Sequence, residues 1–169
     1  SVGLRECMTS RKVFVLADVI ERFDVDWVLM LDVDMICRKN IHQWIDSLLK
    51  DIVDLACVKN IFLKEDDYTR YFSASINFFS SSAFPVVFQW LHYTQTNESI
   101  LELHYFQYFW DQVCLYAAIQ NYTHDISINY LDRFMFIDES FNSNSYYWTW
   151  GTPIKGTKQI VFDFFNEFK

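Results

Sequence analysis

The chain has 169 residues, a formal net charge of −8 and an aromatic content of 20%, with only 3 Gly and 2 Pro. This length suits one domain with a sizeable core, and the composition excludes a disordered, collagen-like or low-complexity chain. The acidic balance argues against a nucleic-acid-binding protein, which presents a basic face. Because the sequence begins at Ser1 within what reads as the lead-in to a helix, we expect a single domain over 1–169 that is truncated at its N-terminus.

The cysteines and the apolar runs exclude several further classes. Cys7, Cys37, Cys57 and Cys114 lack Cys-x-x-Cys spacing, which argues against a zinc site and against a dense disulfide scaffold. We expect reduced thiols, with Cys57 and Cys114 in the core. No apolar run approaches the roughly 20 residues of a membrane span.

Helical and strand periodicities alternate along the chain. Apolar residues at helical spacing predict helices at 11–23, 41–49, 83–91, 110–119 and 158–168, with Ser10, Asn40 and Ser82 as caps and Pro85 in a first turn. Short apolar runs predict strands at 27–31, 54–58, 74–79, 126–130 and 134–137. A charged loop is expected at 60–70, and an irregular aromatic region at 142–150. This alternation predicts an α/β fold, a mixed and mainly parallel sheet with flanking helices.

Two carboxylates follow the strand Trp27–Leu31. Five consecutive apolar residues fit a strand buried on both faces in the centre of a sheet, and Asp32 and Asp34 stand where this strand leaves the core. Carboxylate oxygens suit Mg²⁺ or Mn²⁺, and the carboxyl ends of strands are where open α/β sheets bind ligands. The alternative is a solvated strand end or a cap for the next segment.

The order of these motifs, with Asp32-Val33-Asp34 after a buried strand and Asp111-Gln112 opening a later helix, resembles the GT-A class of nucleotide-sugar glycosyltransferases. The resemblance implies a GT-A-like, Rossmann-like domain that transfers a sugar from a UDP-type donor to a hydroxyl of a glycan, lipid or protein acceptor. It also implies that Asp32 and Asp34 bind Mn²⁺ or Mg²⁺ and that Asp32 contacts the donor. A metal there would offset the charge of the departing diphosphate.

The same resemblance implies roles for residues from other parts of the chain. Asp111 and Gln112 would face the donor sugar, with Asp111 as hydrogen-bond acceptor or as base, unless Asp111 only caps its helix. Ser73, Ser75 and Asn77 occupy the place of an Asn-Ser-Gly turn that contacts donor or acceptor, although Ser replaces Asn and Gly here. Ordinary strand-end hydrogen bonding is the alternative for these three.

Two lysines complete the expected donor site. Lys12 matches a basic residue near the donor phosphates, and a solvated lysine at the start of a helix is its alternative. The look-alikes supply a late His as a third metal ligand near a Gly and Lys turn; this chain has Gly151, Lys155 and Gly156 but no His there. Lys155 is therefore expected to contact a phosphate, and the third ligand is left open among water and the side chains of Asp138, Asn142 and Asn144.

The late aromatic residues and the histidines have simpler expectations. The aromatic residues could stack on a sugar ring or fill the core; they are Tyr146, Tyr147, Trp148 and Trp150. The histidines are scattered without metal-ligand spacing; they are His42, His92, His104 and His124.

Two other functions compete with glycosyl transfer. A phosphatase of the haloacid dehalogenase type also has Asp-x-Asp after a strand, but Gly-Thr normally follows, whereas Met35-Ile36 follow here. A non-catalytic module that binds a sugar nucleotide would tolerate the departures from the family pattern. Neither nucleic acid nor a membrane span within the chain is expected.

Overall fold

The protein is known from a computed structural model that describes residues 2–32, 35–37, 39–59, 72–96, 110–132 and 147–149. The expected loop at 60–70, strand at 134–137 and terminal helix at 158–168 lie outside these residues. No helix within the described part is both long enough and apolar enough to cross a bilayer.

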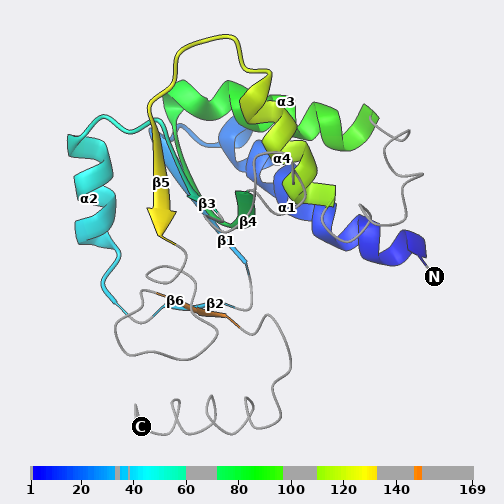
Figure 1. Cartoon of the computed structure of the whole chain (residues 1–169), viewed down its shortest axis with the longest axis horizontal. Helices are drawn as coiled ribbons and strands as arrows, with labels where there is room; N and C mark the ends of the chain where they lie inside the picture. The colour runs from blue at the N-terminus through cyan, green and yellow to red at the C-terminus, as the bar shows by residue number, and fades with distance from the viewer. Residues whose placement is uncertain are drawn as a thin grey trace, which may run out of the picture.

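A four-stranded mixed sheet organises the fold, in the order β1-β4-β3-β5 (Figure 1). Its strands are β1 (Trp27–Leu31), β3 (Leu55–Lys59), β4 (Phe72–Ser80) and β5 (Ile128–Asp132). β4 is antiparallel to both of its neighbours, whereas β3 and β5 are parallel. Three strands therefore run in one direction with β4 reversed between them, which confirms the predicted mixed sheet. Among the described strands β1 is an edge strand, not the expected central one.

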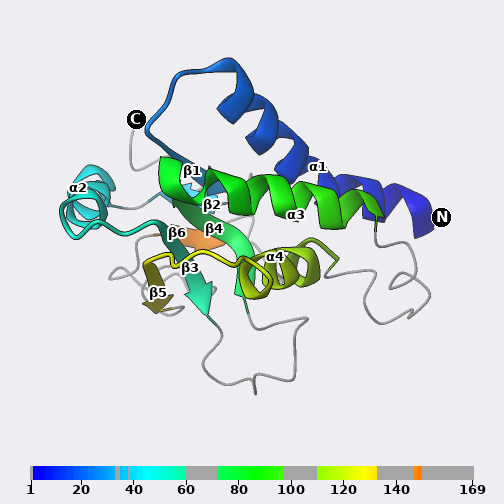
Figure 2. The same ribbon diagram turned by 90° about the horizontal axis from the view of Figure 1, so that it is seen from above.

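Three helices cover one face of this sheet. They are α1 (Val2–Arg22), α3 (Phe84–Thr96) and α4 (Trp110–Gln120), and α1 and α3 lie side by side above the strands (Figure 2). Their apolar side chains pack with the upper face of the sheet in one core that includes Val13, Trp90, Leu115 and Phe72. Pro85 lies in the first turn of α3 as predicted, where a missing N–H costs nothing.

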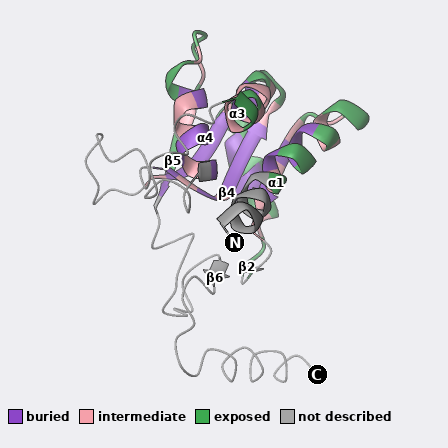
Figure 3. Ribbon diagram, turned by 90° about the vertical axis from the view of Figure 1, so that its right-hand side faces the viewer, coloured by how far each residue is buried: buried purple, intermediate pink, exposed green. Residues whose placement is uncertain are grey.

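The opposite face of the sheet carries α2 (His42–Lys50). Trp44, Ile45 and Leu48 pack there against a second core cluster from β3 and β4. Figure 3 shows the central strands as the most buried layer, between helices with exposed outer surfaces. The side-chain oxygen Oδ1 of Asn40 accepts a hydrogen bond from the His42 N–H at 2.9 Å, which confirms Asn40 as a capping residue.

Several element boundaries differ from those expected. α1 begins at Val2, so Ser10 lies inside the helix and does not cap it. The helix ends at Arg22, which takes Phe23 off the apolar stripe and leaves it 61% exposed. β1 is buried on one face only, with half-buried Trp27, Leu29 and Leu31 on the other.

The region 142–150 is not wholly irregular. Tyr147–Thr149 form β6, which pairs antiparallel with β2 (Met35–Cys37) in a separate two-stranded sheet. Thr149 lies opposite Met35, so a late segment of the chain returns to the residues that directly follow Asp34. Local sequence does not reveal this pairing, because its two strands are more than 100 residues apart and only three residues long.

Candidate functional site

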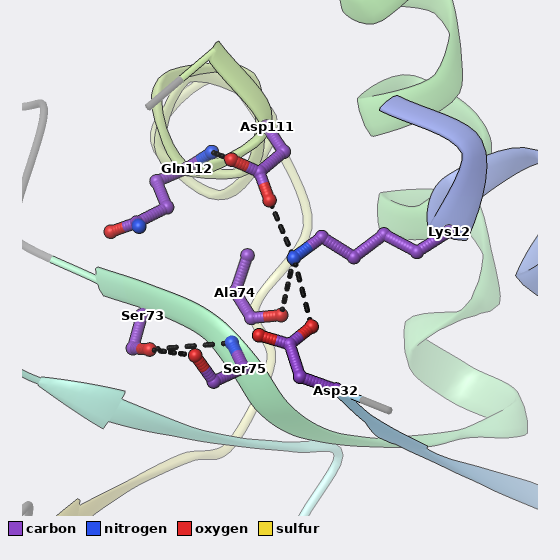
Figure 4. A network of polar contacts seen from close by, with 7 residues as sticks. All are labelled: Lys12, Asp32, Ser73, Ala74, Ser75, Asp111 and Gln112. Carbon is purple, nitrogen blue, oxygen red and sulfur yellow. Dashed lines mark hydrogen bonds and ion pairs between the residues drawn. The ribbon is translucent and has the colours of Figure 1, made fainter. Parts of the chain in front are cut away.

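A half-buried lysine joins three elements at the carboxyl end of β1. The Lys12 ammonium on α1 lies 3.1 Å from Asp32 Oδ1 and 2.5 Å from Asp111 Oδ2, and it donates a hydrogen bond of 3.0 Å to the carbonyl oxygen of Ala74 (Figure 4). The Lys12 side chain is 23% exposed. The alternative expectation, that Lys12 is a solvated lysine, is therefore wrong. Lys12 stands four residues before Leu16, at the border of the apolar stripe, and this position was the available signal for its burial.

Asp32 is fixed by its backbone as well as by Lys12. Its N–H donates to the Ser75 carbonyl at 2.9 Å, and its carbonyl accepts a hydrogen bond from the Met35 N–H at 3.1 Å. The side chain is 32% exposed, and its Oδ2 has no hydrogen-bond partner among the described residues. One carboxylate oxygen is thus held by Lys12, and the other is available to a ligand. Asp34 lies outside the described residues.

Asp111 is the most enclosed charged group of the site. It stands in the first turn of α4 and is 4% exposed, with Oδ1 accepting a hydrogen bond from the Gln112 N–H at 2.9 Å. A carboxylate in the first turn also interacts favourably with the helix dipole. Asp111 therefore does act as an N-terminal helix anchor, and Lys12 brings the same carboxylate next to Asp32.

Burial and charge act in opposite directions on this pair. Burial raises the pKa of Asp111, and the Lys12 ammonium and the Gln112 N–H offset this only in part. Burial by itself would lower the pKa of Lys12, but the charges of Asp111 and Asp32 outweigh it and raise that pKa above 10.5. Lys12 consequently stays charged at neutral pH, and Asp111 takes up a proton more readily than a free aspartate.

An irregularity in β4 explains why a backbone carbonyl is free for Lys12. The pairing of β3 with β4 shifts after Cys57, from Asn77 to Ser73, so Ala74 to Ile76 have no partner in β3. The Ser75 carbonyl accepts a hydrogen bond from the Asp32 N–H, and the Ala74 carbonyl, whose residue has no partner in β3, accepts one from Lys12. Sequence reasoning missed this acceptor, since a β-bulge leaves no residue signature here.

The same irregularity divides the three residues expected on β4. Ser73 lies opposite Val58, which belongs to the core cluster packed against α2. The Ser73 hydroxyl donates a hydrogen bond to the Ser75 hydroxyl at 2.9 Å. Asn77 lies between Met30 and Cys57, under the helical layer, and is fully buried. Neither Asn77 Oδ1 nor Nδ2 has a hydrogen-bond partner among the described residues. The roles of all three in donor binding stay predictions. The two serines are half-exposed, and Ser75 adjoins Asp32 through the hydrogen bond from the Asp32 N–H.

The remaining predicted site residues are not described. Lys155 and the open third-ligand candidates, Asp138, Asn142 and Asn144, lie outside the described residues, as do Tyr146 and Trp150. Of the described residues, no three His, Cys, Asp or Glu side chains group as metal ligands. Among the described residues of this site, Asp32 is the one that fits a hard metal ion, through Oδ2, because its side chain is 32% exposed and Lys12 contacts only Oδ1. Cys57 and Cys114 are buried free thiols, as expected.

Comparisons with known proteins give a likeness of fold. No protein-family model matches the sequence, and no curated protein sequence matches it. Ten chains of solved structures match the fold. Among them is a glycosyltransferase involved in the glycosylation of the major capsid of PBCV-1, with a TM-score of 0.60 and 13% identity over 86% of this chain and 72% of that chain. At this identity, the likeness shows a shared Rossmann-like architecture.

Proposed function

We propose that the protein is a glycosyltransferase whose donor site lies at the carboxyl end of β1. The observation that carries this proposal is the meeting of Asp32, at a strand end, with Asp111, at the start of α4, on a fold similar to that of a glycosyltransferase. Strand ends and helix starts at one edge of an α/β sheet are where such folds bind nucleotides.

The reaction transfers a sugar from a nucleoside diphosphate to an acceptor hydroxyl. The bond from the anomeric carbon to the diphosphate breaks, a bond to the acceptor oxygen forms, and the hydroxyl proton goes to a base or to water. A UDP-sugar is the proposed donor, and a glycan, lipid or protein hydroxyl is the proposed acceptor. Bound Mn²⁺ or Mg²⁺ would supply positive charge at the departing diphosphate.

The residues of this chain would bind and orient the donor. Asp32 Oδ2 and Asp34 would hold the metal ion. The half-exposed Ser75 hydroxyl would donate to a donor oxygen, and the Ser73 hydroxyl, whose single proton goes to Ser75, would accept a hydrogen bond from a donor hydroxyl. Gln112, half-buried beside Asp111, would hydrogen-bond the donor sugar. The pairing of Thr149 with Met35 supports a role for Lys155, six residues later, at the donor phosphates.

Asp111 would accept a hydrogen bond from a sugar hydroxyl. As a base it would benefit from its raised pKa, since bases work best with a pKa near the working pH. However, it is 4% exposed and both of its oxygens already contact protein groups. These contacts favour the positioning of a donor hydroxyl over proton abstraction. They also support the second candidate, a module that binds a sugar nucleotide without turnover.

Calorimetry with UDP, in the presence and absence of Mn²⁺, tests the donor site. Wild type is expected to bind UDP only when Mn²⁺ is present. The variants Asp32→Asn and Asp34→Ala are expected to lose this Mn²⁺-dependent binding. Asp24→Asn removes the same charge from an exposed position before β1 and should bind as wild type does. No binding by wild type, or unchanged binding by Asp32→Asn and Asp34→Ala, would refute the proposal. UDP release from UDP-sugars then separates an enzyme from a binding module.

A further inference from the structure

We propose that Lys12 is a positioning residue. It holds the carboxylates of Asp32 and Asp111 close together, and it leaves only one oxygen of Asp32 free for a metal ion. This inference rests on the proposed function. It replaces the expected contact between Lys12 and the donor phosphates with an action through two carboxylates of the site.

Lys12 has no donor left for a phosphate. A lysine ammonium has three N–H groups and no acceptor. All three have partners in the structure: Asp32 Oδ1, Asp111 Oδ2 and the Ala74 carbonyl. A phosphate could therefore gain a hydrogen bond from Lys12 only by displacing one of these partners. Displacing Asp111 would leave a buried carboxylate without its counter-charge, which is a costly exchange.

Lys12 joins three separate parts of the fold. Its three partners lie at the end of β1, in the first turn of α4 and in the irregular part of β4, and they are distant from one another in sequence. The Asp32 and Asp111 oxygens lie within 3.1 Å of one nitrogen atom. Two carboxylates this close would repel each other if that cation were absent. Lys12 thus permits the strand end and the helix start to converge.

Lys12 also limits how Asp32 could bind a metal ion. It occupies Asp32 Oδ1, so Oδ2 alone would be free to hold the ion. A fixed positive charge beside that carboxylate also opposes the binding of a divalent cation. With the ammonium about 5 Å from a divalent ion and an effective dielectric constant close to that of water, about 80, this opposition is worth on the order of tenfold in affinity.

The test uses Mn²⁺ alone, by calorimetry, with turnover as a second measurement. Lys12→Met should bind Mn²⁺ more tightly, by about tenfold, because a repelling charge is lost and Asp32 gains a free oxygen. Its kcat should fall, since Asp111 is no longer held in place. A lysine that only stabilises the fold would lower metal affinity and turnover together. Arg22→Met is the control, because it removes a cation from an exposed ion pair on the same helix.

If Lys12→Met does not fold, a second pair of variants tests the same inference. Asp111→Asn removes the buried carboxylate, so Lys12→Met/Asp111→Asn leaves no unpaired charge in the core. The double variant should still bind Mn²⁺ more tightly than Asp111→Asn alone, since the two proteins differ only at Lys12.

The failures of the two proposals can be told apart. Equal or weaker Mn²⁺ binding by the Lys12→Met proteins, or a gain equal to that of Arg22→Met, overturns the inference and leaves the donor site standing. Absence of Mn²⁺ binding by wild type overturns the metal site of the proposed function, and this inference with it.

Discussion

Replacing Lys12 with Met should destabilise the protein far more than the loss of an ordinary surface charge. The Asp111 side chain is 6% exposed and would lose its counter-charge, whereas the Asp32 side chain is 32% exposed and can be solvated. Removing one partner of a buried pair costs about 3–5 kcal/mol. Because Lys12 itself retains some exposure, we take the lower end, about 3 kcal/mol, which corresponds to roughly 6–12 °C in Tm for a chain of this size.

Urea denaturation of four proteins measures this effect. The cycle comprises wild type, Lys12→Met, Asp111→Asn and the double variant. The double variant should be more stable than Lys12→Met, with a coupling energy of at least about 1.5 kcal/mol, because it removes the unpaired buried carboxylate. Arg22→Met breaks the exposed pair with Asp18, whose atoms are 2.7 Å apart, and should cost at most about 0.5 kcal/mol.

The pH dependence gives an independent check. Without Lys12, the pKa of Asp111 rises further, because the cause that lowers it is removed and burial remains. A carboxylate with a raised folded-state pKa destabilises the protein in full above that pKa, and this penalty declines as the pH falls from there toward the lower pKa of the unfolded chain. The deficit of Lys12→Met should therefore shrink as the pH is lowered from 8 toward 5. A loss below about 0.5 kcal/mol at neutral pH, or a coupling energy that small, would refute the buried ion pair.

Three further predictions concern other features. Ile52→Gly should raise the free energy of unfolding by about 0.5–1 kcal/mol in urea titrations. Ile52 lies just after α2 with a φ of 53°, which strains a β-branched residue, and its side chain is 78% exposed. An unchanged or lower free energy of unfolding would contradict this backbone strain. The stabilisation from Lys12 should persist below pH 10.5 and be lost only above it, since the folded-state pKa is raised; a difference from Lys12→Met that fades at pH 8 would contradict this. Cys37 should react with a thiol reagent in the native protein, whereas Cys57 and Cys114, whose pKa burial raises to about 12, should react only on unfolding; fast native labelling of either would contradict their burial.

Sequence patterns predict the helices and strands whose apolar residues have a strong periodicity. The apolar run Trp27–Leu31 and the helix from Trp110 were predicted at nearly their observed bounds, because each buries its own apolar residues. The same patterns gave no position for β1 within the sheet, since five apolar residues fit a central strand and a half-covered edge strand equally well. The reversed direction of β4 was also hidden, because strand direction depends on connections and not on composition.

The candidate site was predicted in its members but not in its contacts. The strand-end position predicts Asp32, the family resemblance predicts Asp111, and the structure brings the two together. That resemblance does not specify that Lys12 joins them, nor that a bulge frees the Ala74 carbonyl, because both depend on three-dimensional packing. Asn77 is the clearest departure: as a residue on the same strand as Ser73 and Ser75 it was grouped with them, and the shift in pairing separates it.

The pairing order of the strands affects how the chain can fold. Among the described strands, β1 has one neighbour, β4, whose register with it joins Trp27 to Ser80 and Leu31 to Ile76. The five apolar residues of β1 must therefore remain unpaired during synthesis until β4 has been made, and β2 must wait for β6, more than 100 residues later. Contacts this distant in sequence form slowly and leave apolar strand edges open to aggregation. Asp32, at the carboxyl end of β1, consequently lacks the partner of its backbone N–H until Ser75 has been made.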